Sequence, residues 1–101
     1  MLTVEQIRNA LKNVIDPELG YNIIDLGLVY NIVPKERSVD IEMTLTAPTC
    51  PLGPALIAAV KQTLLDLFPD DLDEVNVEIV WLPIWSPDMM SDELKEELGY
   101  A

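Results

Sequence analysis

The sequence contains no histidine among its 101 residues and a single cysteine, Cys50. Without an imidazole, Ser-His and Cys-His catalytic pairs, histidine metal sites and the usual proton shuttle near neutral pH are excluded. One cysteine cannot form an internal disulfide, which agrees with a reducing compartment. Any chemistry must therefore come from carboxylates, hydroxyls, one thiol, backbone amides or a second molecule.

Basic residues are also scarce, since six Lys and Arg face eighteen Asp and Glu and the formal net charge is −12. A nucleic acid backbone would be repelled along most of such a surface, so nucleic acid is not an expected partner. High net charge of either sign mainly keeps a protein soluble. A basic protein partner remains open.

Long hydrophobic runs are missing as well. No stretch approaches the roughly 20 uninterrupted apolar residues that a membrane span requires, and the start of the sequence shows neither a basic leader nor an apolar signal core. We therefore expect a soluble, cytoplasmic protein that does not associate with membranes. Half of the residues are apolar, which is enough to enclose one core, so we expect a single domain over residues 1–101.

The first part of the chain predicts a helix over residues 4–13. Thr3 and Gln6 have the spacing of a capping box, and apolar residues then recur at helical intervals. The helix should end before Asp16 and Pro17, because the residue preceding a proline is pushed away from helical backbone angles.

The middle of the chain predicts an antiparallel hairpin. Residues 28–33 are rich in strand formers, 34–37 form a polar break of hairpin length, and 39–45 alternate between apolar and polar side chains. Such alternation is typical of a strand that is covered on one face only.

A loop and a second helix follow the hairpin. Residues 46–54 contain three prolines and a glycine, which excludes a regular strand or helix interior. From Pro54 to about Phe68, apolar residues form a broad helical stripe that should cover one face of the sheet.

The last part of the chain predicts a third strand over 75–81 and a short helix capped by Ser91 and closed by Gly99. The predicted order is helix, strand, strand, helix, strand and short C-terminal helix. The fold class is therefore α/β of the two-layer α+β kind, with a small mixed sheet of three to four strands. The apolar tail residues should pack over the sheet edge or a partner surface; they are Trp81, Trp85, Met89 and Met90.

Cys50 is the main candidate for chemistry, because it occupies a proline-shaped loop that leads directly into the second helix. Amides at a helix start favour the thiolate, which is the form that attacks electrophiles and binds soft metals. The alternative is that Cys50 is simply a small buried apolar residue, as most free cysteines are.

Two carboxylates and two hydroxyls accompany this cysteine as candidate site residues. Asp16 and Glu18 flank Pro17 and could bind a metal or share a proton, although an Asx-type turn is the favoured role for Asp16. Thr46 and Thr49 could donate hydrogen bonds to a sulfur or a substrate oxygen, or they could cap the following helix.

Three motifs occur in a specific order: Asp-Pro-Glu at 16–18, Asp-Leu-Gly-Leu-Val-Tyr at 25–30 and Thr-Ala-Pro-Thr-Cys-Pro at 46–51. In this the chain resembles the SufT and PaaD-like metal-sulfur cluster assembly family, which includes the cytosolic iron-sulfur targeting factors of eukaryotes. The similarity extends from Val4 to the region of Trp85. The resemblance implies a compact α/β domain and a role in maturing iron-sulfur proteins.

The resemblance also implies the site residues: the reactive cysteine falls on Cys50, the acidic motif on Asp16 and Glu18, and the hydroxyl positions on Thr46 and Thr49. The sequence lacks the cysteine-rich tail associated with PaaD proteins, so it is more similar to SufT. The expected partners are the iron-sulfur assembly machinery and client apoproteins.

The resulting hypothesis is that Cys50 supplies one thiolate to an iron-sulfur cluster or iron that is held only transiently. Protein-bound clusters commonly take four thiolates, so the other ligands would come from a partner or from a second copy in a homodimer. Two alternatives stay open. The chain could recruit clients as an adaptor that binds no metal, or it could be a thiol enzyme in which Asp16 or Glu18 is the base for a Cys50 nucleophile; an enzymatic role is left undecided.

Overall fold

The computed structural model describes residues 1–46 and 53–99. Its elements follow one another in the predicted order: α1 (Val4–Leu11), β1 (Val29–Pro34), β2 (Ser38–Met43), α2 (Gly53–Leu67), β3 (Glu74–Ile79), a 3₁₀ turn η1 (Pro87–Met89) and α3 (Asp92–Leu98). The α+β fold class is confirmed. No helix in this described part is long and apolar enough to cross a bilayer.

The three strands form one mixed sheet in the order β1-β2-β3. β1 and β2 are the expected antiparallel hairpin, in which Ile32 pairs with Ile41 and the Lys35 amide donates to the Ser38 carbonyl at 2.8 Å. β2 and β3 are parallel, with Ile41 opposite Val77. Parallel neighbours need a long crossover connection, and α2 lies within the one between β2 and β3.

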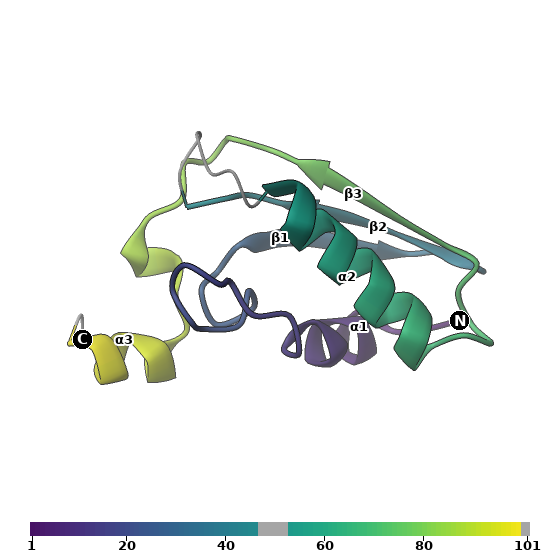
Figure 1. The fold of residues 1–101 in the computed structure, drawn as a ribbon, viewed down its shortest axis with the longest axis horizontal. Coiled ribbons are helices and arrows are strands. Elements are labelled where there is room, and N and C mark those ends of the chain that lie inside the picture. Colours follow the sequence, from purple (N-terminus) through teal and green to yellow (C-terminus); the bar gives the residue numbers. More distant parts are fainter. Residues whose placement is uncertain (47–52, 100–101) are drawn as a thin grey trace.

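The helices α1 and α2 lie on the same face of the sheet, which gives two layers (Figure 1). Alternation along β2 accounts for this arrangement, because Val39, Ile41 and Met43 are buried and face the helices. The residues between them point to the opposite, open face. Burial of one face and solvation of the other explains why apolar and polar residues alternate so regularly in this strand.

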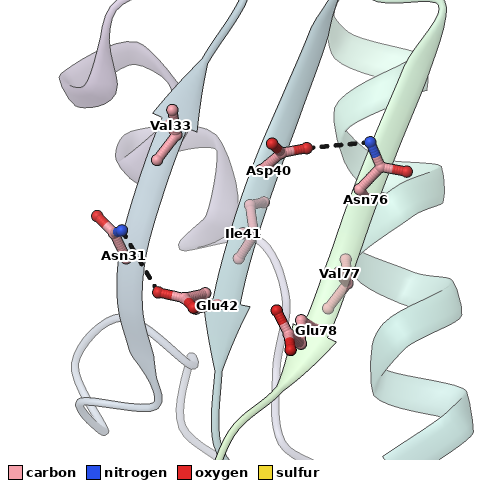
Figure 2. Close-up of a pocket in the computed structure, with 8 residues that line it drawn as sticks. All are labelled: Asn31, Val33, Asp40, Ile41, Glu42, Asn76, Val77 and Glu78. Atoms are coloured by element: carbon pink, nitrogen blue, oxygen red, sulfur yellow. Dashed lines mark hydrogen bonds between the residues drawn. The ribbon is translucent and has the colours of Figure 1, made fainter.

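The open face of the sheet is polar (Figure 2). Asn76 donates a hydrogen bond to Asp40 at 3.0 Å, and Asn31 donates to Glu42 at 3.4 Å, so amide and carboxylate side chains pair across neighbouring strands. A shallow hollow of about 400 Å³ runs over these side chains.

Some element ends differ from the prediction. α1 ends at Leu11 rather than Asn13, because the amide of Asn13 turns back to the Ala10 carbonyl at 3.1 Å. β2 ends at Met43 rather than residue 45, since the Thr44 amide donates to Leu28, outside β1. α2 begins at Gly53, one residue before the expected start.

The caps of the terminal helices are as predicted. Thr3 and Gln6 form a complete capping box at α1. At α3, the Ser91 hydroxyl accepts from the Leu94 amide at 3.3 Å, and Gly99 ends the helix in the left-handed conformation with φ of 84°.

Candidate functional site

The Asp-Pro-Glu motif forms a tight turn after α1. Asp16 is buried, and its Oδ1 accepts hydrogen bonds from the Glu18 amide at 2.8 Å and the Leu19 amide at 3.3 Å. The Gly20 amide closes the turn by donating to the Asp16 carbonyl at 2.7 Å. This is the Asx-type turn favoured for Asp16. It leaves the side chain of Glu18 on the surface.

Glu18 and Thr46, which are far apart in the sequence, line the same pocket of about 440 Å³. The turn after α1 supplies one wall, the end of the β2 segment supplies another, and the C-terminal tail supplies the rest. The lining residues are Glu18, Leu19, Tyr21, Leu26, Thr46, Trp85, Pro87, Met90 and Leu98. We call this the acidic-motif pocket. The sequence reasoning did not anticipate the contributions of Tyr21, Leu26 and Leu98.

Thr49 and Cys50 lie outside the residues that the structure describes. The flanks of their segment are described on both sides. Thr46 reaches the acidic-motif pocket, and Gly53 starts α2 close to the end of β2: a methyl group at Gly53 would lie 3.0 Å from Leu45 Cδ1. Thr46, on one side of the segment that contains Cys50, therefore lines the candidate site, and Gly53, on the other side, lies beside Leu45.

This location is at the carboxyl ends of the parallel strands β2 and β3, where β2 leads into α2. In α/β sheets, ligands bind in the crevice outside the carboxyl ends of parallel strands, where helix starts present unpaired amides. The candidate site occupies the corresponding place in this small sheet.

The motif at 25–30 anchors the C-terminal tail. The Trp85 indole donates to the Leu26 carbonyl at 2.6 Å, the Ser91 amide donates to the Asp25 carbonyl at 2.7 Å, and the Tyr30 hydroxyl donates to the Pro83 carbonyl at 2.7 Å. All three acceptors are backbone carbonyls, which every residue type carries, so the sequence gives little sign of these contacts. The tail thus becomes part of the site.

Gly27 lies directly against the tail. Its φ is +77°, and a methyl group there would run into the backbone carbonyl of Met89. Glycine at this position therefore allows the tight bend before β1 and leaves room for the tail.

Another hollow, of about 440 Å³, lies beside the acidic-motif pocket at the ends of β2 and β3. It is lined by Thr44, Leu45, Thr46, Trp81, Leu82, Ile84 and Trp85, and we call it the apolar groove. Thr46 and Trp85 line both hollows. Of the tail residues expected to pack, Met90 is buried and Trp85 is partly buried, whereas Trp81 is 44% exposed.

Leu82 and Ile84 are residues that the sequence reasoning missed. They are 78% and 75% exposed, unusually high for large apolar side chains. The available signal was the uncharged stretch from Val80 to Pro87, which has no helical or alternating pattern that would bury all of its apolar members.

Comparison with known proteins identifies the family of this chain. The family described as "Iron-sulfur cluster assembly protein" matches residues 4–78, about three quarters of the chain. The chain belongs to this iron-sulfur cluster assembly family.

Two curated relatives are similar to this chain over nearly their whole length. The chain is 44% identical over 96 residues to the Fe-S protein maturation auxiliary factor YitW of Bacillus subtilis, covering 94% of the chain and 92% of the relative. It is 46% identical over 89 residues to the Fe-S protein maturation auxiliary factor SufT of Staphylococcus aureus, covering 87% and 99%.

A solved structure supports the family fold. The crystal structure of a domain of unknown function from Bacillus anthracis matches with a TM-score of 0.88 and 37% identity, covering 96% of the chain and 92% of that structure. The predicted resemblance to the SufT family is therefore confirmed.

Within residues 1–46 and 53–99, no group of three or more carboxylates, cysteines or histidines is placed to hold a metal ion.

Proposed function

We propose that this member of the iron-sulfur cluster assembly family works in the cytoplasm as a maturation factor that hands cluster or iron to client apoproteins through Cys50. The observation that carries the proposal is the acidic-motif pocket. It joins Glu18 and Thr46 at the flank of the segment that contains Cys50, and these are positions that the family resemblance marks.

Cys50 is suited to bind cargo as a thiolate. It stands three positions before the first residue of the 15-residue helix α2. The positive end of a helix dipole lowers the free energy of a nearby thiolate relative to the thiol, and the thiolate is the form that binds iron. The hydroxyls of Thr46 and Thr49 would donate hydrogen bonds to the thiolate or to a cluster sulfide.

The other cargo ligands would come from the donor and acceptor proteins. Cluster-binding proteins commonly supply four thiolates, whereas this chain has one. Cys50 alone therefore holds cargo weakly, which suits a protein that passes it on. The expected partners are assembly machinery on one side and client apoproteins on the other.

Anaerobic transfer from a cluster-loaded scaffold protein to an apo iron-sulfur enzyme tests this proposal. The wild-type chain should accelerate recovery of enzyme activity, and Cys50→Ser should remove most of the acceleration while folding normally. Thr46→Val should give an intermediate rate. Iron content and absorbance of the chain re-isolated during transfer would show whether cargo resides on it.

Two results would contradict the role of Cys50. Equal acceleration by Cys50→Ser and wild type would leave the adaptor hypothesis, in which the chain recruits clients without touching metal. Turnover of a small-molecule electrophile by wild type but not by Cys50→Ser, with no effect on transfer, would instead favour a thiol enzyme.

A further inference from the structure

The apolar groove is an exposed surface that the maturation chemistry at Cys50 does not require. Trp81, Leu82 and Ile84 are 44%, 78% and 75% exposed and lie within four positions of the chain. Large apolar side chains gathered in this way mark interaction surfaces, because leaving apolar surface in water is unfavourable and burying it against a partner is favourable.

The groove is held in shape before anything binds. On one side, the hydrogen bond from Trp85 to the Leu26 carbonyl ties its inner wall to the loop before β1. On the other side, the Tyr30 hydroxyl donates to the carbonyl of Pro83, which stands between the exposed residues Leu82 and Ile84 in the sequence. A preformed groove orders fewer groups on binding, which favours affinity.

The groove is continuous with the candidate site. Thr46 and Trp85 form a shared wall between it and the acidic-motif pocket. An occupant of the groove would therefore lie next to the flank of the segment that contains Cys50.

Charge indicates which occupant fits. None of the residues that line the groove is charged, and the uncharged stretch 80–87 is bounded by Glu78 and Asp88. A second copy would bring together two chains of net charge −12 each, which opposes association through this patch. Basic side chains beside an apolar anchor would instead be attracted.

Arg8 lies near the tail, since it lines a neighbouring hollow together with Pro83, but two cations of the hairpin are already paired with carboxylates, and the net charge of −12 still favours a basic occupant. Lys35 is paired with Asp40 at 2.7 Å, and Arg37 is paired with Asp73. Both cations belong to the β1-β2 turn, which lies at the other end of the strands from the tail (Figure 1).

We propose that the apolar groove docks a segment of a partner protein that carries apolar anchor side chains flanked by lysine or arginine. The choice of a protein partner rests on the proposed maturation function, in which cargo passes between proteins. Docking in the groove would bring the partner's cluster ligands next to Thr46, at the flank of the segment that contains Cys50, and so could supply the thiolates that this chain lacks.

Fluorescence anisotropy with two synthetic peptides tests the inference. Both peptides carry the same core of Leu, Trp and Ile, flanked by lysines in one and by glutamates in the other. The full chain should bind the lysine-flanked peptide at least about tenfold more tightly, and raising the salt concentration should narrow this difference.

Groove variants locate the binding. The double variant Leu82→Ser with Ile84→Ser should weaken binding of the lysine-flanked peptide by about tenfold or more. Leu67→Ser is the matched control, because Leu67 is also apolar and 51% exposed but lies at the end of α2; it should change binding less than about twofold. Circular dichroism checks that both variants are folded.

Equal binding by the double variant and wild type would overturn the inference. So would a wild-type dimer in sedimentation equilibrium that the double variant disrupts, because a second copy would then be the occupant. The transfer assay keeps the two proposals apart. If the groove variants weaken peptide binding as expected but Cys50→Ser transfers cluster at the wild-type rate, only the role of Cys50 is contradicted. If the groove variants leave peptide binding unchanged but Cys50→Ser has lost transfer, only the docking site is contradicted.

Discussion

The indole Nε1 of Trp85 donates a hydrogen bond to the backbone carbonyl of Leu26 at 2.6 Å, joining residues that are 59 positions apart. This contact fixes the tail over the Asp25-Leu26-Gly27 loop. Trp85 lines both the acidic-motif pocket and the apolar groove, so the shape of each depends on the same bond.

Replacing the indole of Trp85 by a phenyl ring removes the hydrogen-bond donor while keeping an aromatic side chain, and should destabilise the fold. Trp85→Phe leaves the Leu26 carbonyl without its indole partner, and we expect a loss of about 1 kcal/mol in the free energy of unfolding. Trp81→Phe is the control, because Trp81 is 44% exposed and should change stability by less than about 0.5 kcal/mol. Urea denaturation measures both; equal losses would contradict a specific role for the Trp85 bond.

Two glycines with nearly the same backbone angle should respond very differently to alanine. Gly20 and Gly27 have φ of +79° and +77°, but a methyl group at Gly20 meets no atom within 4 Å, whereas at Gly27 it meets the Met89 carbonyl. Gly20→Ala should lose about 1 to 2 kcal/mol from backbone strain alone. Gly27→Ala should lose at least about 2 kcal/mol more, because the tail must move. Thermal unfolding of the two variants gives the comparison, and similar losses would argue against close packing of the tail.

The role of Asp16 can be divided between its turn and its charge. Asp16→Asn keeps an oxygen that can accept from the Glu18 and Leu19 amides, so its stability should stay within about 0.5 kcal/mol of wild type. Asp16→Ala should lose about 1 to 2 kcal/mol, because both amides lose their acceptor.

The cluster-transfer assay then tests the charge. We expect Asp16→Asn to transfer cargo almost as fast as wild type, since the carboxylate mainly shapes the turn that presents Glu18. A folded Asp16→Asn variant that has lost transfer would show that the charge itself acts on the cargo.

The ion pair between Arg37 and Asp73 should give a pH-dependent contribution to stability. The hydrogen bond from Arg37 lowers the pKa of Asp73 below its ordinary value of 3.8. A carboxyl whose pKa is lower in the folded state stabilises the fold above the unfolded value, and this contribution disappears as the pH falls below 3.8 through the folded value.

Arg37→Gln should therefore lower the urea midpoint slightly at pH 7 and have little effect near pH 2. The effect is small because both side chains are exposed to solvent. Lys61→Gln, at an exposed position on α2, removes the same charge without this partner and should show no such pH dependence below pH 4. A difference between Arg37→Gln and wild type that persists unchanged at pH 2 would contradict the assignment.

Much of the fold could be predicted because its causes are local. The capping box of Thr3 and Gln6, the alternation through Val39 and Ile41, and the Gly99 stop each follow from short-range sterics, hydrogen bonds and periodicity. Element ends were less accurate, since they depend on where distant amides find partners. The Thr44 amide donates to the carbonyl of Leu28, which lies outside β1, and no local sequence pattern predicts that bond.

The sequence by itself determined the types of element, their order, the acidic character of the chain and the family, because these depend on residue type and spacing. Tertiary structure alone decided that Glu18 and Thr46 share a pocket, that the tail closes on the Leu26 loop, and that Leu82 and Ile84 remain exposed. The physical reason is that these relationships join segments far apart in the chain. Where such a contact is accepted by a backbone carbonyl, as at Leu26, it leaves little trace in the sequence, because nearly every residue type carries the same carbonyl.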